Sequence, residues 1–465
     1  MPVYGRLTPT FTSCACAHEV VRASTTTAGA TIRIIMRASL PEGSNSDCRT
    51  KTDLERILGQ KPETVQVVGR RRVKVPRVCD DLGPGGGPMN YRVISADDHI
   101  DLPWLPKDLW QKRVPAQWRE RSPKVVDTSD GPVWVCGDDR WDSWGGRKGA
   151  AGAQGGRRTA LERGGVLEPG VLRPTTTALR LADMDRDGVD ATVMYGPIVP
   201  LLIGDPELRK VCYRAYNDWL AEFCATAPER LLGAGLVPID DAKSAADEVR
   251  YLKHLRLRTG MFLAARVEVP LWDESWEPLW EAAAETGISI SFHLGGGLRT
   301  VAFSGPKASD PGNMGVRVAC STLQMDEPLA AVIFSGALER FPQLKIVLAE
   351  TGIGWLPYML ERMDDSYQRF VDAPDFWRAH GGLPLTMAPS RYFRRQVWAT
   401  FQTDRVGLRL VDVLGEDRVM WASDYPHADS TWPDSQKAIS ENFKDVTQAA
   451  RRRILCDNAR ALYGL

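Results

Sequence analysis

The chain lacks an excess of charge of either sign, a long apolar run and a paired set of cysteines. In 465 residues, Lys plus Arg and Asp plus Glu number 59 each, so no overall field attracts nucleic acid or an anionic membrane. No stretch approaches the roughly 18 consecutive apolar residues of a membrane span. The N-terminus also lacks the basic start and apolar core of a secretory signal. The expected partner is therefore a small-molecule substrate, without nucleic acid or membrane.

The nine cysteines are scattered along the sequence. An odd, dispersed set in a large chain favours a reducing cytoplasm over a disulfide framework. Cys14 and Cys16 form the closest pair, in the sequence CAC, and this spacing is too short for the usual zinc-binding motifs. The sequence thus predicts a cytoplasmic protein without structural disulfides.

Residues 1–88 show little periodicity and are rich in Thr, Arg, Ser and Gly. They contain the basic run GRRRVKVPR (69–77), which is either a solvated charge cluster or a polyanion-binding segment. This composition predicts a poorly structured N-terminal extension. A second hypothesis starts the natural protein at Met89, because codons for the preceding GGGP are G-rich enough to form a ribosome-binding site. Abundant native peptides from before Met89 would contradict that hypothesis.

Residues 89–465 alternate short apolar segments with amphipathic ones and are predicted to form one catalytic domain. Amphipathic helices are expected over 207–227 and 273–287, among others. Eight strands separated by helices predict an α/β fold, a (β/α)8 TIM barrel, with a doubly wound open sheet as the alternative. The expected strands are 91–99, 190–196, 231–239, 258–265, 288–296, 344–352, 396–401 and 418–426.

Residues 123–173 form an insertion after the first predicted strand. Its first part reads as a β-hairpin around the Asp-Gly pair at 130–131, and 143–165 is rich in Gly and Arg. Loops that follow barrel strands lie at the active face. The insertion is therefore either a mobile lid over the site or a disordered surface loop.

The first predicted strand ends in three ionisable residues, Asp97, Asp98 and His99. Side chains alternate between the two faces of a strand, so Asp97 and His99 point the same way and Asp98 points oppositely. Asp97 and His99 can therefore bind one ion. Asp98 is expected to face the helical layer or to cap a turn.

Three further strands end in ionisable residues, namely His293, Glu350 and Asp424. The C-terminal ends of barrel strands converge on one mouth. With Asp97 and His99, the residues His293 and Asp424 give two imidazoles and two carboxylates, a set that suits one divalent ion, zinc or manganese. Such an ion would also compensate the carboxylate of Asp424 at the end of the apolar segment VMWA (419–422).

The remaining polar residues of these strand ends receive catalytic or binding roles. Asp424 is expected to shuttle a proton beside the metal, and Glu350 is expected to orient water or to act as general acid. His427, three residues after Asp424, either contacts substrate or makes a structural hydrogen bond. Each of these residues, taken alone, could equally be an ordinary helix-cap or turn residue.

One motif imitates a calcium loop. In DMDRDGVD (183–190), Asp183, Asp185, Asp187 and Gly188 have the correct spacing, but the twelfth position is Met194 rather than Glu. The better interpretation is a helix that ends at Gly188 before the second strand.

With these residues in view, the chain resembles the amidohydrolase superfamily, in the branch that contains aminocarboxymuconate-semialdehyde decarboxylase and aromatic-acid decarboxylases. The resemblance runs from about Tyr91 to the C-terminus. It is carried by ISADDHIDLPWLPKDLW (94–110), LADMDRDGVDATVMYG (181–196), RFPQLKIVLAETGIGWLPYMLERMD (340–364), SRYFRRQVWATFQTD (390–404) and WASDYPHADSTWP (421–433).

The resemblance implies one divalent metal, with zinc favoured over manganese, held at the positions of Asp97, His99, His293 and Asp424. It also implies a homodimer. Two departures from the family pattern stand out. The strand-one pair is Asp-x-His where His-x-His is common, which gives a harder site. Strand six carries Glu350 where the family often has a catalytic His.

The sequence thus favours a metal-dependent carboxy-lyase that decarboxylates a small aromatic or unsaturated carboxylic acid. The first alternative is a metal-dependent hydrolase of a carbon–carbon, ester or amide bond. The second is a non-catalytic barrel that binds a ligand, because a fold does not fix a function.

Overall fold

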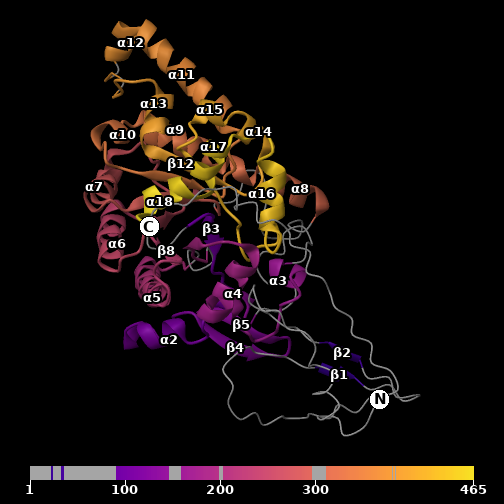
Figure 1. The fold of residues 1–465 in the computed structure, drawn as a ribbon. Coiled ribbons are helices and arrows are strands. Elements are labelled where there is room, and N and C mark those ends of the chain that lie inside the picture. Colours follow the sequence, from indigo (N-terminus) through magenta and orange to yellow (C-terminus); the bar gives the residue numbers. More distant parts are fainter. Residues whose placement is uncertain are drawn as a thin grey trace. The chain divides into compact units, whose positions relative to one another are not determined.

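Eight apolar segments form the strands of a single parallel barrel (Figure 1). Each strand pairs with the next along the chain, which confirms the predicted TIM barrel and rules out the doubly wound alternative. The sheet closes where backbone N–H groups of Asp424 and His99 donate to the carbonyls of Asp97 and Tyr425, over 2.9 and 2.7 Å. The strands, in spatial order, are β3 (Ile94–His99), β7 (Ala191–Tyr195), β8 (Leu231–Leu236), β9 (Thr259–Phe262), β10 (Ser289–His293), β11 (Ile346–Ala349), β12 (Val397–Phe401) and β13 (Val419–Trp421).

This computed structural model describes residues 91–145, 159–197, 203–295, 310–379, 381–382 and 384–465, with two short strands before them. Those strands, β1 (Arg22–Ser24) and β2 (Arg33–Ile35), pair antiparallel. The chain divides into two units, Met1–Pro76 and Arg77–Leu465. Apart from β1 and β2, the predicted extension 1–88 lies outside the described residues, so its nature and the Met89 start stay predictions.

Glycines in β8 let two outer helices approach the barrel closely. A Cβ at Gly235 would lie 2.3 Å from Leu252 Cδ2, and one at Gly233 would lie 2.9 Å from Leu220 Cδ2. Real side-chain carbons do not approach so near, so these helices can pack on β8 only because the positions carry no side chain. Their leucines are fully buried. The sequence GAG in this strand is therefore a packing feature.

The helices cover the outside of the barrel, and α5, α6 and α7 lie side by side along it (Figure 1). The longest is α5, which begins after Asp205, whose side chain accepts from the N–H groups of Glu207 and Leu208. The α-helices of the barrel unit are α2 (Leu109–Arg113), α3 (Ala160–Arg163), α4 (Thr177–Asp187), α5 (Pro206–Cys224), α6 (Ala242–His254), α7 (Glu277–Thr286), α8 (Pro311–Cys320), α9 (Asp326–Phe334), α10 (Ala337–Arg340), α11 (Leu356–Asp372), α12 (Pro374–Arg378), α13 (Pro389–Gln396), α14 (Arg405–Arg409), α15 (Val411–Leu414), α16 (Ser435–Asn442), α17 (Gln448–Arg452) and α18 (Asn458–Tyr463).

Short helical turns join these elements. They are the 3-10 turns η2 (Leu102–Trp104), η3 (Ala116–Trp118), η5 (Arg173–Thr175), η7 (Ala264–Arg266), η8 (Glu274–Trp276) and η9 (Ser321–Met325), and the π-helical turn η10 (Arg453–Asp457).

The calcium-like motif is the end of α4, as predicted. The helix stops at Gly188, whose φ of 71° is left-handed. Two of the carboxylates are already paired, because Asp183 accepts from Arg173 at 2.7 Å and Asp185 from Arg230 at 2.8 Å.

The insertion begins with an antiparallel meander of three strands, β4 (Lys124–Thr128), β5 (Gly131–Cys136) and β6 (Asp139–Ser143). The turn between β4 and β5 consists of Ser129 and Asp130, and Gly131 begins β5, which confirms the hairpin predicted around the Asp-Gly pair. Residues 146–158, in the Gly- and Arg-rich part, lie outside the described residues.

The end of the insertion docks on the loop that follows β13. Thr159 and Glu162 form a capping box that begins α3. Arg163, at the end of α3, donates to the carbonyls of Ala428, Ser430 and Trp432. An apolar cluster supports the same contact, made of Trp104, Ala160, Leu161, Tyr425 and Trp432. This part of the insertion is thus fixed to the mouth of the barrel.

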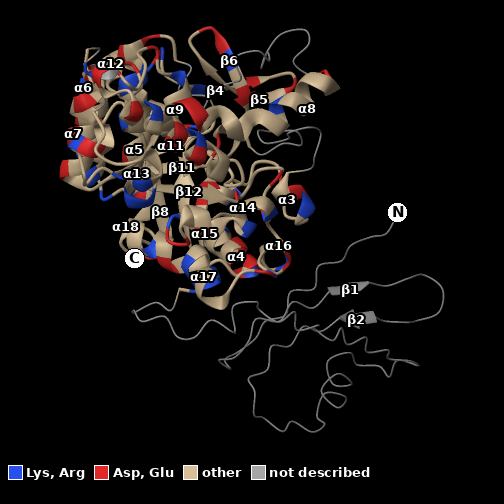
Figure 2. Cartoon of the chain, turned by 90° about the horizontal axis from the view of Figure 1, so that it is seen from above, with Lys and Arg blue, Asp and Glu red and all other residues tan. Residues whose placement is uncertain are grey.

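Acidic and basic side chains are interspersed over the helices, as the equal totals predict (Figure 2). The helices within the described ranges are all too short or too polar to cross a bilayer. Among the described residues Cys136, Cys212, Cys224, Cys320 and Cys456 are free thiols.

Candidate metal centre

β3 brings Asp97 and His99 to the mouth of the barrel. The Nε2 atom of His99 lies 3.4 Å from Oδ1 of Asp97, and both side chains are buried. A hydroxyl group fixes the other carboxylate oxygen, because Thr400 Oγ1 on β12 donates to Asp97 Oδ2 over 3.2 Å. Asp97 Oδ1 is thereby turned toward the imidazole. Asp98 points away from this pair, toward Arg180 of α4.

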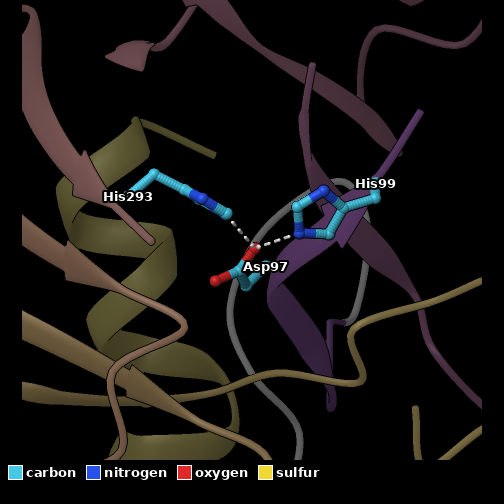
Figure 3. Close-up of side chains that lie close together, drawn as sticks. All are labelled: Asp97, His99 and His293. Atoms are coloured by element: carbon cyan, nitrogen blue, oxygen red, sulfur yellow. Dashed lines mark ion pairs between the residues drawn. The ribbon is translucent and has the colours of Figure 1, made fainter. Parts of the chain in front are cut away.

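His293, the last residue of β10, faces the same carboxylate. Its Nε2 atom is 3.6 Å from Asp97 Oδ1, so Asp97 lies between two imidazoles (Figure 3). The other ring nitrogen, Nδ1, is 2.8 Å from the carbonyl of Leu294. This contact leaves Nε2 available to bind an ion.

Glu350 and Asp424, at the ends of β11 and β13, complete the cluster. Glu350 Oε2 is 3.7 Å from His293 Nε2, and Asp424 Oδ1 is 3.3 Å from His99 Nε2. Both residues have left-handed backbones, with φ of 59° and 60°. Such a conformation costs on the order of 1–3 kcal/mol for a non-Gly residue and is common at functional sites.

The side chains of the cluster fit a divalent ion. Several buried atoms of the cluster make no hydrogen bond to the described residues; they are Asp97 Oδ1, both ring nitrogens of His99, His293 Nε2 and Asp424 Oδ2. Metal–ligand bonds of roughly 2.0–2.2 Å at tetrahedral angles place neighbouring ligand atoms about 3.3–3.6 Å apart. The separations of Asp97 Oδ1 from His99 Nε2 and from His293 Nε2, 3.4 and 3.6 Å, match this geometry.

The described residues contain four overlapping groups of potential ligands, and two of them include His427, with His99 and Asp101 or with Asp424 and Asp429. The remaining two share His99. One is Asp97, His99 and His293, and the other is His99, Glu350 and Asp424. Within each group the ligand atoms lie within 4.8 Å of one another. Glu350 therefore lies at ligand distance, although the sequence suggested only a catalytic role for it.

The pKa shifts of these residues are those expected of a site that binds a cation. Burial and the nearby carboxylate of Asp424 raise the pKa of Glu350 well above its usual range. Burial likewise raises the pKa of Asp424, against the effect of His427. Burial, with the neighbouring His427, lowers the pKa of His99 to about 4, which keeps its imidazole neutral as a metal ligand must be. No Lys or Arg among the described residues forms an ion pair with these carboxylates.

His427 lies between two carboxylates. Its Nδ1 is 2.9 Å from Asp424 Oδ1, and its Nε2 is 2.9 Å from Asp101 Oδ2. Its ring also packs on that of His99, with centroids 4.0 Å apart. Because both nitrogens have protein partners, the geometry favours the hydrogen-bonding role over direct substrate contact.

Sequence reasoning missed Asp101 and Thr400. Asp101 continues the alternation of Asp97 and His99, so it carried a readable signal, but it lies two residues beyond the end of β3. Thr400 carried no such signal, because a Thr within an apolar strand is common and does not indicate a functional site. Its hydroxyl accepts from the N–H of Glu350 at 2.8 Å while donating to Asp97.

A model of the amidohydrolase family matches residues 177–465, more than half of the chain. The chain belongs to the amidohydrolase family. The matched region contains His293, Glu350 and Asp424, whereas Asp97 and His99 precede it.

The individual proteins that are similar to this chain have low sequence identity to it. This chain is 26% identical to a gamma-resorcylate decarboxylase of Polaromonas sp. (strain JS666 / ATCC BAA-500), over 62% of this chain and 86% of the relative. An amidohydrolase structure from Mycobacterium avium subsp. paratuberculosis K-10 superposes with a TM-score of 0.65 and 23% identity, covering 81% of this chain and all of that one.

A further solved structure similar to this chain contains manganese. It is that of a mutant of the 5-carboxyvanillate decarboxylase of Novosphingobium aromaticivorans DSM 12444, with a TM-score of 0.55 and 20% identity, covering 82% of this chain and 99% of that one. Its structure contains manganese and 3-methoxy-4-hydroxy-5-nitrobenzoic acid.

Proposed function

We propose that this amidohydrolase is a metal-dependent decarboxylase of a small aromatic carboxylic acid. The observation that carries the proposal is the buried cluster of Asp97, His99, His293 and Asp424, several of whose atoms make no hydrogen bond to the described residues. Two relatives are named as decarboxylases of aromatic acids. Both matches cover most of the length of the relative.

The four clustered residues would hold one divalent ion. Two carboxylates beside two imidazoles, with Glu350 at ligand distance, make a harder donor set than a zinc site of His and Cys. This donor set supports manganese, and the related structure with bound manganese supports it further. Zinc, which the sequence favoured, remains the alternative. When bound, the ion would polarise oxygen atoms of the substrate and offset its negative charge.

The protein's own carboxyl groups would handle the proton. Decarboxylation breaks the bond between the ring carbon and the carboxylate, and carbon dioxide departs while the electron pair stays on that carbon. The carbon then needs a proton. Glu350 and Asp424 are the buried carboxyl groups beside the centre, and we assign Glu350 as the acid and Asp424 as a ligand that exchanges the proton with it.

Asp101 and His427 would hold Asp424 in place. The imidazole donates to Asp424 Oδ1 and leaves Oδ2 free to face the ion. Asp101 fixes the far side of the ring. A carboxylate–His–carboxylate chain of this kind orients a metal ligand and stabilises its charge.

Hydrolysis is the second candidate. Glu350 Oε2, 3.7 Å from His293 Nε2, lies where a carboxylate can orient a water molecule beside the centre. The same ligands would serve either reaction. The substrate's bond type separates the two, because a decarboxylase acts on the free acid and a hydrolase acts on its ester or amide.

The test is a release assay on the full-length chain loaded with Mn²⁺ or Zn²⁺. The substrates are a panel of hydroxylated and methoxylated benzoic acids and their methyl esters. We expect carbon dioxide from at least one acid and no turnover of the esters. Ester hydrolysis without carbon dioxide would favour the hydrolase, and ligand binding without any turnover would favour a non-catalytic barrel.

Two variants assign the carboxyl groups in this assay. Asp424→Asn should lose both the metal and turnover, whereas Glu350→Gln should retain the metal and lose turnover. Asp185→Asn, on the surface of α4, is the matched control and should behave as the unchanged chain. Full activity of Asp424→Asn would contradict the proposed centre.

A further inference from the structure

We propose that Asp98, which points away from the ion, is a positioning residue that fixes the metal ligands of β3 relative to the ligand of β13. The inference rests on the proposed metal centre. Asp98 stands between the two β3 ligands, Asp97 and His99, and its carboxylate is almost completely buried, with 2% exposed. It belongs to no group of potential metal ligands among the described residues.

The carboxylate of Asp98, on β3, connects β7, α4 and the segment that follows β13. Its Oδ1 accepts hydrogen bonds from Ser95 Oγ at 2.8 Å, Ser423 Oγ at 2.7 Å and the backbone N–H of Tyr425 at 3.1 Å. Its Oδ2 accepts from Thr192 Oγ1 at 2.6 Å and Arg180 Nη2 at 3.2 Å. Ser423 and Tyr425 flank Asp424, so Asp98 holds both neighbours of that ligand.

This bridge lies where the barrel closes with little regular pairing. β13 pairs in register with β12, whereas the backbone hydrogen bonds to β3 come from the segment after it, between Asp424 and Asp97 and between His99 and Tyr425. One more bond involves a side chain, from the N–H of Ser423 to Ser95 Oγ at 2.8 Å. Side chains therefore set how far Asp424 lies from the β3 ligands.

Arg180 ties the carboxylate to the backbone of a ligand. Its guanidinium is fully buried. Besides binding Asp98, it donates through Nη1 to the carbonyl of His99 at 3.0 Å, and it packs over the ring of Tyr425 at 5.0 Å. A buried ion pair gives little net stability compared with apolar packing, and its best-attested use is to specify one arrangement. Here that arrangement is the alignment of His99 with Tyr425 and Asp424.

The charge of Asp98 matters as well as its shape. An amide at this position offers one acceptor oxygen and one N–H₂ donor. If the oxygen faces Ser423 and Tyr425, the amide group faces Arg180 and leaves its cation without a counter-ion. In the reverse orientation, the N–H₂ group faces the hydrogen-bond donors of Ser95, Ser423 and Tyr425 and cannot accept from them. Either orientation disturbs the spacing of the ligands.

The experiment measures binding of Mn²⁺ to the metal-free full-length chain, followed by the electron paramagnetic resonance signal of free Mn²⁺. For Asp98→Asn we expect affinity to fall about 10- to 100-fold, the size of effect seen when groups that orient metal ligands are changed. Thr192→Val, which removes one donor to Oδ2, should cause a smaller loss. Asp187→Asn, a buried Asp on α4 outside the centre, is the matched control and should bind within about twofold of the unchanged chain.

A second readout separates positioning from general destabilisation. The visible spectrum of Co²⁺-loaded protein reports the geometry of the ligands. It should change in Asp98→Asn and in Thr192→Val, and it should not change in Asp187→Asn. Thermal unfolding in the presence of a chelator shows which variants are folded, and Thr192→Val keeps the test valid if Asp98→Asn does not fold.

The outcomes are distinct. If the unchanged chain binds neither Mn²⁺ nor Co²⁺, the metal centre is wrong and this inference falls with it. If the unchanged chain binds and folded Asp98→Asn or Thr192→Val binds equally well with the same spectrum, the metal centre stands and only the role of Asp98 is overturned.

Discussion

The metal centre takes its ligands from two regions of the barrel that are built differently. His293 ends β10, which pairs in unbroken parallel register with β9 and β11 on its two sides. Asp97, His99 and Asp424 lie at the seam between β3 and β13, where two backbone hydrogen bonds close the sheet. β3 also shifts register against its other neighbour, β7.

The difference shows two ways to place a ligand. A regular ladder positions a side chain through backbone hydrogen bonds alone. The seam instead uses buried polar side chains, namely the Asp98–Arg180 pair and the Asp101–His427 pair, together with a left-handed backbone at Asp424. Each of these features costs stability. The seam should therefore be the region where small changes alter the metal centre most.

The largest effect on stability is expected from breaking the ion pair of the seam. Arg180→Met leaves the carboxylate of Asp98 buried without its cation, which should destabilise the fold by about 3–5 kcal/mol. The comparison is Arg362→Met, whose pair with Asp365 on α11 is open to water because the two side chains are 46% and 57% exposed. That variant should lose about 1 kcal/mol or less. Urea unfolding of the metal-free chains measures both, and equal losses would contradict a special role for the seam.

Asp187 offers a buried carboxylate that, unlike Asp98, forms no ion pair within the described part of the chain. Burial raises its pKa from 3.8 to about 7, and its Oδ2 makes no hydrogen bond to the described residues. As pH rises from 3.8 toward 7, the unfolded chain releases this proton while the folded chain retains it, so stability is lost over that window and the loss is complete above it.

Asp187→Asn removes this penalty while its amide oxygen can still accept from the N–H of Ser435. The variant should therefore be more stable than the unchanged chain at about pH 8, by up to about 4 kcal/mol, and equally stable near pH 4. Urea unfolding at the two pH values measures the difference. A gain of the same size at both pH values would show that titration of Asp187 is not its cause.

The Asp101–His427 pair of the seam is expected to affect turnover. His427→Phe keeps an aromatic ring but removes the donor to Asp424 Oδ1, so under the proposed function kcat should fall about 10- to 100-fold. Asp101→Asn should cause a smaller loss, because Asp101 reaches Asp424 only through the imidazole. Steady-state kinetics on the acid identified by the release assay measure both. A rise in KM alone would instead support direct contact between His427 and substrate.

The sequence predicted the metal ligands themselves better than the contacts that align them. The eight strands and the ends that carry Asp97, His99, His293 and Asp424 follow from apolar periodicity and from the fixed alternation of side chains. These are local properties, readable within a few residues. The hairpin of the insertion was predicted on the same basis, from one Asp-Gly pair.

The contacts of the seam depend on distant residues and could not be read in this way. Arg180 meets Asp98 across 82 positions of the sequence, and Arg163 meets Ala428 across 265. The left-handed backbones of Glu350 and Asp424 also lacked a signal, because that conformation is normally encoded by Gly. Such features arise only when the barrel closes.

The smallest effect is expected on the ladder side. Ser291 lies on β10, two residues before His293, and its hydroxyl lies 2.9 Å from both Tyr195 Oη and Thr259 Oγ1. Ser291→Ala should destabilise the fold by about 1 kcal/mol through the lost hydrogen bonds. Mn²⁺ affinity should nevertheless remain within about twofold, because the ladder keeps His293 in place without this hydroxyl. A loss of affinity as large as that of Asp98→Asn would mean that buried polar side chains align the ligands on both sides of the barrel, and the contrast between ladder and seam would be wrong.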